Sequence, residues 1–269
     1  MELLYGIPAV LLLVAVLSVV VGAAVGVQAL IHRRFDSSSF VAHNEVGGII
    51  ITVVAALYAV LLGFMTVVAW EHFQDARGIV VAESDATIDA WHVAVGLPSP
   101  VKERVRTDMI QYAHVMVDHE WALMKRGRSD ETAAMISMDA LDAAGAFIPT
   151  NAGEANAQSA TIQQLNTLHD ARQRRIASNA AGLSWFEWLV LVCGALCIVG
   201  FCWLFGGSKP KVQMIMTATV AVMIASTMVL LFEIQYPFRS SIGVGSEAWK
   251  AAISHIHEMQ MGRLPNMRM

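Results

Sequence analysis

The chain of 269 residues is 56% hydrophobic and only 15% charged, with a mean hydropathy of +0.54. Soluble domains carry about 25% charged residues, so the composition excludes an ordinary water-soluble enzyme. The formal net charge of -4 argues against a nucleic-acid-binding protein, because such a protein presents a basic face. The three cysteines lie within one apolar run and predict no disulfide framework.

Four apolar runs are long enough to cross a bilayer, which takes about 20 residues. None of them alternates with the period of two that is typical of barrel strands, so we expect four transmembrane helices. The first run lacks a basic n-region and is too long for a signal peptide, so we expect it to be retained as a span. The predicted spans are 7–31, 46–70, 185–205 and 212–232.

These spans predict an all-α membrane protein with an extramembrane insert. Residues 1–70 form the first transmembrane pair, 71–184 the insert, 185–235 the second pair, and 236–269 a C-terminal loop and short helix. Apolar residues in the insert recur at helical spacing, and no alternating β-branched run occurs there. The second span is therefore expected to continue out of the membrane as one helix.

Small residues lie on one face of the second span. Such stripes allow helices to approach closely where lipid provides no hydrophobic drive for association. The same stripe leaves room for an ion if it faces a pore, so a packing role and a pore-lining role both stay open. The stripe consists of Gly48, Thr52, Ala55, Ala56, Ala59, Gly63 and Thr66.

Charged residues near the membrane ends are candidates for a pore mouth. Glu71 and Asp75 stand one turn apart just beyond the second span and would form acidic rings in a symmetric oligomer, unless they belong to a solvated face. Arg172, Arg174 and Arg175 near the third span would form a basic ring or bind anionic lipid headgroups. The two sets leave the sign of a conducted ion open.

The fourth span carries a candidate polar seam. Thr219, Ser226 and Glu233 are spaced seven residues apart and share one face. A carboxylate in a span is a functional candidate by default. Because Glu233 follows about 21 weakly polar or apolar residues, a simple interfacial position is the alternative.

No pattern predicts catalysis, a cofactor or a metal. The nine histidines include no pair at the spacing of the His-Glu-x-x-His zinc motif. Phosphate-binding loops, dinucleotide fingerprints and the nucleophile-elbow motif do not occur in the sequence. We therefore expect a protein that is not an enzyme.

Basic residues in short loops predict the orientation in the membrane. Arg33 and Arg34 follow the first span, and Lys209 and Lys211 follow the third, whereas the N-terminus has none. The positive-inside rule then places both loops in the cytoplasm and the insert outside. The three arginines just before the third span argue for the opposite orientation.

Several short motifs resemble one known family. They are Trp70 to Ala76 at the end of the second span, Gly96-Leu97-Pro98, Tyr112, Glu120-Trp121, Tyr236-Pro237-Phe238, Gly243-Val244 and Glu247-Ala248-Trp249. From about Val46 to Met259 the chain resembles the bacterial membrane proteins called bestrophin-like. The label implies kinship with bestrophins, which are homopentameric anion channels with four spans and a helical insert between the second and third.

That resemblance implies a homo-oligomer, pentameric if it follows bestrophins, in the bacterial inner membrane. The second span would line its ion pathway, with a leaning toward anions. Two features depart from bestrophins: their neck carries bulky apolar residues, and their insert is cytoplasmic. The alternative is a non-conducting membrane scaffold or sensor whose insert binds a protein or lipid partner.

Overall fold

The computed structural model describes residues 5–34, 44–205 and 210–262. Throughout these ranges the regular structure is helical, without any strand, as the sequence predicts. Among the described residues, four helices are long and apolar enough to cross a membrane. The chain divides into two compact units, described in turn below: a membrane unit that holds these spans and an insert unit.

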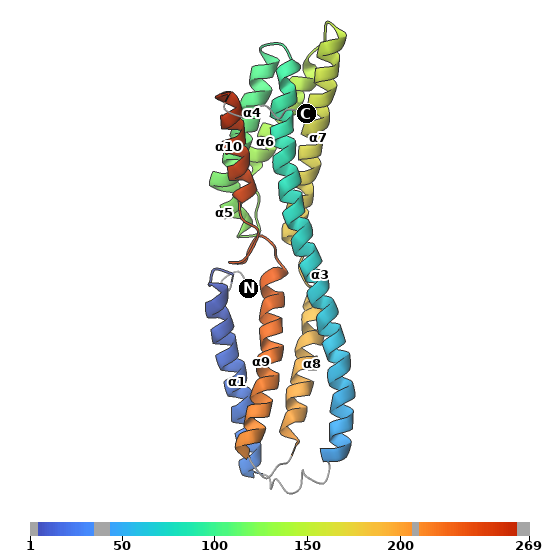
Figure 1. Cartoon of the computed structure of the whole chain (residues 1–269), viewed down its shortest axis with the longest axis vertical. Helices are drawn as coiled ribbons and strands as arrows, with labels where there is room; N and C mark the ends of the chain where they lie inside the picture. Colours follow the sequence, from blue (N-terminus) through green and yellow to red (C-terminus); the bar gives the residue numbers. More distant parts are fainter. Residues whose placement is uncertain (1–4, 35–43, 206–209, 263–269) are drawn as a thin grey trace. The chain divides into compact units, whose positions relative to one another are not determined.

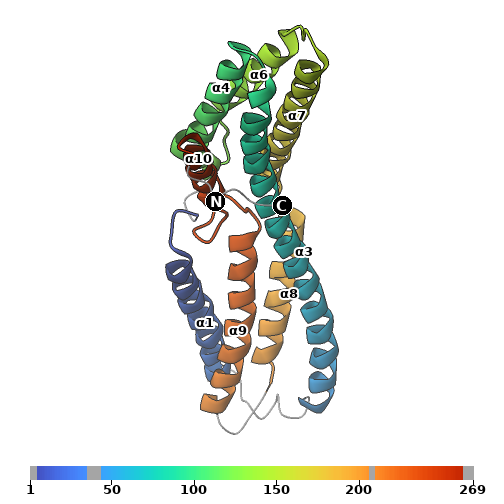
Figure 2. The same ribbon diagram turned by 45° about the horizontal axis from the view of Figure 1, so that its top comes forward.

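The membrane unit contains α1 (Ala9–Arg34), the first half of α3 (Asn44–Val93), α8 (Trp185–Trp203) and α9 (Pro210–Ile234). Helix α1 runs antiparallel to α9, which is its main partner, and makes fewer contacts with α8 (Figures 1 and 2). Helix α8 begins with a capping box, in which Ser184 and Glu187 each satisfy a backbone N–H of the other. The side chains of Ser184 and Glu187 therefore determine that α8 starts at residue 185.

Polar contacts join three segments at one end of the membrane unit. The Gln235 amide donates to the Tyr5 hydroxyl at 2.9 Å and accepts from the Trp188 indole at 3.0 Å. The Tyr5 ring stacks on Phe232, with 4.5 Å between ring centroids. These contacts hold the chain just before α1 against the end of α9 and the start of α8.

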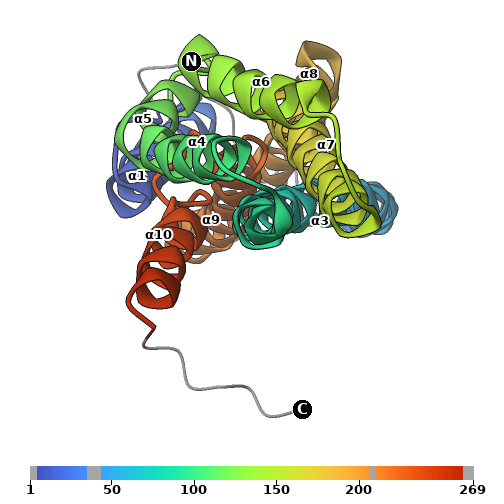
Figure 3. The same cartoon turned by 90° about the horizontal axis from the view of Figure 1, so that it is seen from above.

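The insert unit has a core of its own. It comprises the second half of α3, a 3₁₀ turn (Ala94–Gly96), α4 (Val101–Val115), a π-helix (Met116–Glu120), α5 (Trp121–Met124), α6 (Glu131–Ala146), α7 (Ala152–Ala180) and α10 (Glu247–Gln260). Helix α6 packs on both α4 and α7 (Figure 3). Side chains such as Val105, Met109 and Leu168 are fully buried between these helices.

The C-terminal helix belongs to the insert unit, although it follows the fourth span in sequence. Trp249 of α10 is completely buried, edge to face with Tyr112 of α4 at 5.6 Å. The Trp121 indole donates to the carbonyl oxygen of Val244 at 3.1 Å, and its ring meets Phe238 at 6.0 Å. The described part of the C-terminal segment contains a short helix, α10, which aromatic side chains bury in the insert core.

Helix α3 has 50 residues and is continuous from the second span into the insert, as the periodicity predicts. About 20 residues suffice to cross the hydrocarbon core, so the helix continues well past the span. Its sequence has no proline, and its glycines lie at one end or at exposed positions. Nothing in the sequence breaks the backbone hydrogen bonds where the apolar run ends.

Candidate functional site

One face of α3 is buried within the membrane unit. Tyr58 and Leu62 are each 7% exposed and Ala69 is 4% exposed. The Tyr58 ring lies against Gly194 of α8, where a Cβ would overlap the ring, and its hydroxyl donates to the carbonyl oxygen of Leu191 at 3.0 Å. Helix α3 thus meets its own chain on this face.

The small-residue stripe lies on a neighbouring face, most of which the described chain leaves uncovered. An added Cβ at Gly48 or Gly63 would meet no atom within 4 Å. The hydroxyls of Thr52 and Thr66 bond to carbonyl oxygens one turn earlier in the same helix, at 2.7 and 2.8 Å. The side chains at Thr52, Ala56, Ala59 and Gly63 are exposed, and those at Gly48, Ala55 and Thr66 are half-buried.

A third face carries large apolar side chains that are also exposed. Leu57, Phe64 and Val68 have exposed fractions of 68%, 67% and 58%. Glu71 and Asp75, both exposed, continue this row at helical spacings of three and four. The acidic pair therefore shares a helix face with the large residues and not with the small-residue stripe.

The predicted basic ring is wrong for two of its three arginines. Arg172 is 2% exposed and Arg175 is completely buried, because both point into the core of the insert unit. Arg174, between them, is exposed. Buried and paired guanidinium groups cannot attract ions or lipid headgroups at a surface, so Arg174 is the one member of this set available for such a role.

The two buried arginines belong to a four-charge network. Arg175 binds both carboxylate oxygens of Glu83 on α3, at 2.5 and 3.1 Å, and reaches Glu120 of the π-helix at 3.2 Å. Arg172 pairs with the same Glu120 oxygen at 3.1 Å. Both carboxylates are fully buried, and two positive charges balance two negative ones.

Neutral groups complete the network. The Tyr112 hydroxyl donates to Glu83 at 2.5 Å, and the Asp130 backbone N–H donates to Glu120 at 2.7 Å. Burial, followed by the charge of Glu83, raises the pKa of Tyr112 above its usual value. Burial alone would lower the pKa of Arg175, but its interactions with Glu83, Tyr112 and Glu120 together outweigh that effect and the pKa is raised. Arg175 therefore stays charged and Tyr112 stays neutral.

The three residues of the predicted seam on α9 have different surroundings. The Thr219 side chain is exposed, with its hydroxyl bonded to the Ile215 carbonyl oxygen at 2.9 Å. Ser226 is half-buried, whereas Glu233 is 2% exposed and its two carboxylate oxygens have no hydrogen-bond partner among the described residues. Glu233 is thus a buried carboxylate in the last turn of α9.

A family model for the Bestrophin-like domain matches residues 14–249. The chain belongs to the Bestrophin-like family. Solved structures agree on the fold: one point mutant of a bacterial bestrophin homolog from Klebsiella pneumoniae superposes with a TM-score of 0.69 at 14% identity, covering 91% of this chain and 99% of that chain. A second point mutant of that homolog gives a TM-score of 0.66 at 13% identity, covering 89% and 98%.

A further crystal structure of the Klebsiella pneumoniae homolog, phased with zinc, matches with a TM-score of 0.63 at 14% identity, covering 90% of this chain and 98% of that chain. A comparison with curated proteins gives no match. At these identities the structures show a shared fold. Membership of the family makes the present protein a Bestrophin-like membrane protein, as its motifs indicate.

The buried charge network is the feature of this Bestrophin-like chain that the sequence analysis missed. Glu83 falls in the buried row of α3 that includes Val80 and Thr87. Arg172 and Arg175 continue the buried row of Leu165 and Leu168 on α7. Charged residues at apolar positions of a helical repeat are the signal that indicates such a network.

Proposed function

We propose that this Bestrophin-like protein is a homo-oligomeric ion channel whose pathway is lined by α3. A chain with four spans has little room for a pore within itself, so the pathway would lie on a symmetry axis. The observation that carries the proposal is that α3 packs on its own chain with one face and leaves two faces uncovered. A ring of copies needs both: one for the neighbouring copy and one for the axis.

The chemistry of the two faces assigns their roles. Small residues such as Gly63 let helices approach closely, so the stripe would pack against the neighbouring copy. The row of Leu57, Phe64 and Val68 would then face the axis, where apolar constrictions gate by dewetting. Glu71 and Asp75 continue this row and would form acidic rings at its end.

The exposed charges at the end of this row support a proposal for the sign of the conducted ion. The resemblance implies a preference for anions, but Arg172 and Arg175 are buried and contribute no basic ring. Acidic rings favour cations, so the structure supports cation entry at this end of the pathway. The reversal potential in a potassium chloride gradient distinguishes a cation-selective channel from an anion-selective one. Replacing Glu71 and Asp75 with Gln and Asn is expected to move it toward the anion value.

Flux through proteoliposomes that contain the purified protein tests the proposal. We expect flux above that of empty liposomes from an oligomer of fixed copy number, five if the assembly follows bestrophins. Gly63→Leu should weaken the oligomer, because a large side chain separates the helices. Leu57→Gly should leave assembly intact and increase flux by widening the apolar constriction. A monomeric protein that gives no flux would contradict the channel proposal and favour the scaffold or sensor alternative.

We further propose an inner-membrane location with the insert outside the cytoplasm. Arg33, Arg34 and Lys211 lie at the end of the membrane unit where α1 ends and α9 begins (Figure 1). Lys209, which the prediction also used, lies outside the described residues. The opposite orientation was favoured by the three arginines before the third span. Two of them, Arg172 and Arg175, are paired with buried carboxylates, so only Arg174 still favours it. Labelling of a cysteine at exposed Arg126 in intact cells tests this orientation.

A further inference from the structure

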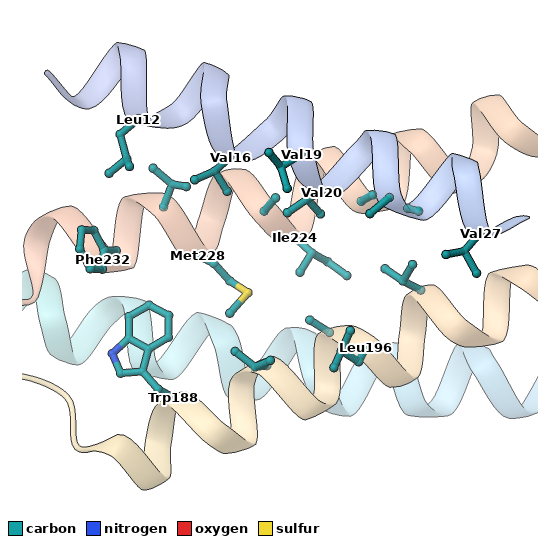
Figure 4. A pocket seen from close by; sticks show the side chains of 18 of the residues that line it. Leu12, Val16, Val19, Val20, Val27, Trp188, Leu196, Ile224, Met228 and Phe232 are labelled. Carbon is teal, nitrogen blue, oxygen red and sulfur yellow. The ribbon is translucent and has the colours of Figure 1, made fainter. Parts of the chain in front are cut away.

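Three helices of the membrane unit enclose an apolar cavity. Side chains of α1, α8 and α9 converge on it from three sides (Figure 4), and its volume is about 490 Å³. All its lining residues are apolar or aromatic, from Leu12 to Val27 along α1. At 1.5 Å per residue this stretch spans about 22 Å, more than the roughly 15 Å of one hydrocarbon leaflet.

The cavity is open along one side, and aromatic side chains of α8 contact the neighbouring helices toward its two ends. At one end the Trp203 indole of α8 donates to the carbonyl oxygen of Ala24 on α1 at 2.9 Å. At the other, Trp188 of α8 lies edge to face with Phe232 of α9 at 6.4 Å. Along the open side, Val19 on α1 and Leu196 on α8 are 71% and 62% exposed.

The apolar lining of this cavity fits a hydrocarbon chain. Protein interiors keep few voids larger than a water molecule, and an apolar cavity is not filled by water. A helix of a second copy is 10–12 Å across, and the hydrogen bond from Trp203 to Ala24, which joins α8 to α1 across the open side, would obstruct it. A flexible acyl chain can enter through the open side and lie along the groove.

Charge indicates which lipid would supply that chain. Arg34 is exposed and continues the exposed rim of α1 at helical spacing from Val27, seven residues earlier. Arg33 beside it and Lys211 in the first turn of α9 are also exposed. At the opposite end, Glu187 caps α8. An anionic headgroup is therefore complementary to the end of the groove marked by Arg34.

We propose that the groove between α1, α8 and α9 holds one acyl chain of an anionic phospholipid, whose phosphate is bound by Arg33, Arg34 and Lys211. The lipid fills the gap that α1 and α8 leave between them, where these helices make few direct contacts. It is thus an integral part of the membrane unit. This proposal does not depend on ion conduction.

Native mass spectrometry of the full-length protein tests it. The protein is reconstituted with equal amounts of phosphatidylglycerol and phosphatidylcholine that carry the same acyl chains. We expect one phosphatidylglycerol per chain to remain at collision energies that remove the other lipids. Replacing Arg33, Arg34 and Lys211 together with Gln should reduce the preference for phosphatidylglycerol on the order of tenfold or more. Arg126→Gln, exposed in the insert unit, should leave it unchanged.

A second experiment fills the groove with larger side chains and measures lipid retention. Val20→Trp puts a large side chain into the cavity, and Val14→Trp puts the same side chain on an exposed position of α1 that does not line it. We expect Val20→Trp to lose the retained lipid and Val14→Trp to keep it. Ala195→Leu, a smaller addition to the lining of α8, should weaken retention at least several-fold in a chain that still folds.

Three results would overturn the proposal. The first is that no phospholipid remains on the unaltered protein. The second is equal retention by Val20→Trp and Val14→Trp. The third is that Val20→Trp changes the number of copies in the oligomer and not the retained lipid, which would assign the groove to a second copy of the chain.

Discussion

The membrane unit and the insert unit differ in how completely they bury their large apolar side chains. The insert unit buries Trp249, Tyr112 and the four-charge network in a closed core. The membrane unit leaves large apolar residues such as Leu57 and Phe64 exposed on α3, since hydrocarbon or another copy is their natural surrounding. The insert core is therefore complete in one chain, whereas the surroundings of α3 are not.

The largest predicted effect concerns the closed core. Arg175→Met leaves Glu83 and half of the Glu120 interactions without a cation in a buried site. Breaking one side of a buried ion pair costs about 3–5 kcal/mol. Equilibrium unfolding in detergent should show that loss. Arg174→Met, on the exposed neighbour, should stay within about 0.5 kcal/mol; an equally large effect there would show that the network is not special.

A smaller effect is predicted where α3 meets its own chain. At Gly194 a Cβ would overlap the Tyr58 ring, so Gly194→Ala should cost about 1–3 kcal/mol through overpacking. Gly200 lies on the same helix, and a Cβ added there would meet no atom within 4 Å. The matched control Gly200→Ala should therefore unfold at the same denaturant concentration as the parent or higher. Similar losses at both glycines would contradict the packing of α3 on α8.

The smallest predicted effect is at the start of α6 in the insert unit. Asp130 caps this helix by accepting the Thr132 N–H at 2.8 Å, and these hydrogen bonds lower the pKa of its carboxyl. Asp130→Ala should cost about 1 kcal/mol. Because the folded-state pKa lies below the unfolded value of 3.8, this contribution is complete above that pH and is lost as the pH falls through the folded-state pKa. A difference between the two proteins that stays constant down to pH 2 would contradict the cap.

Local signals made much of the fold predictable. Long apolar runs predict spans, and Ser184 with Glu187 predicts where α8 starts. The continuous α3 follows from periodicity without a proline. These features depend on neighbours in the sequence, so they require no knowledge of tertiary contacts.

Long-range pairing was not predictable in the same way. The positions of Arg172 and Arg175 in the apolar repeat of α7 signal their burial, but that repeat does not identify their partners, Glu120 and Glu83, which lie far away in the sequence. The faces of α3 illustrate an intermediate case. The spacing from Leu57 through Phe64 to Glu71 already places the acidic residue on the bulky face, but only burial identifies which face packs on α8.

Cysteine accessibility during ion flux tests the central claim about α3 most directly. After replacement of Cys193, Cys197 and Cys202 with Ser, single cysteines are introduced at Phe64 and at Ala59, and a charged thiol reagent is added to conducting proteoliposomes. We predict that modification at position 64, on the face assigned to the axis, changes the flux, whereas position 59, packed against the neighbouring copy, does not react. Reaction and block at position 59, with none at 64, would contradict the account.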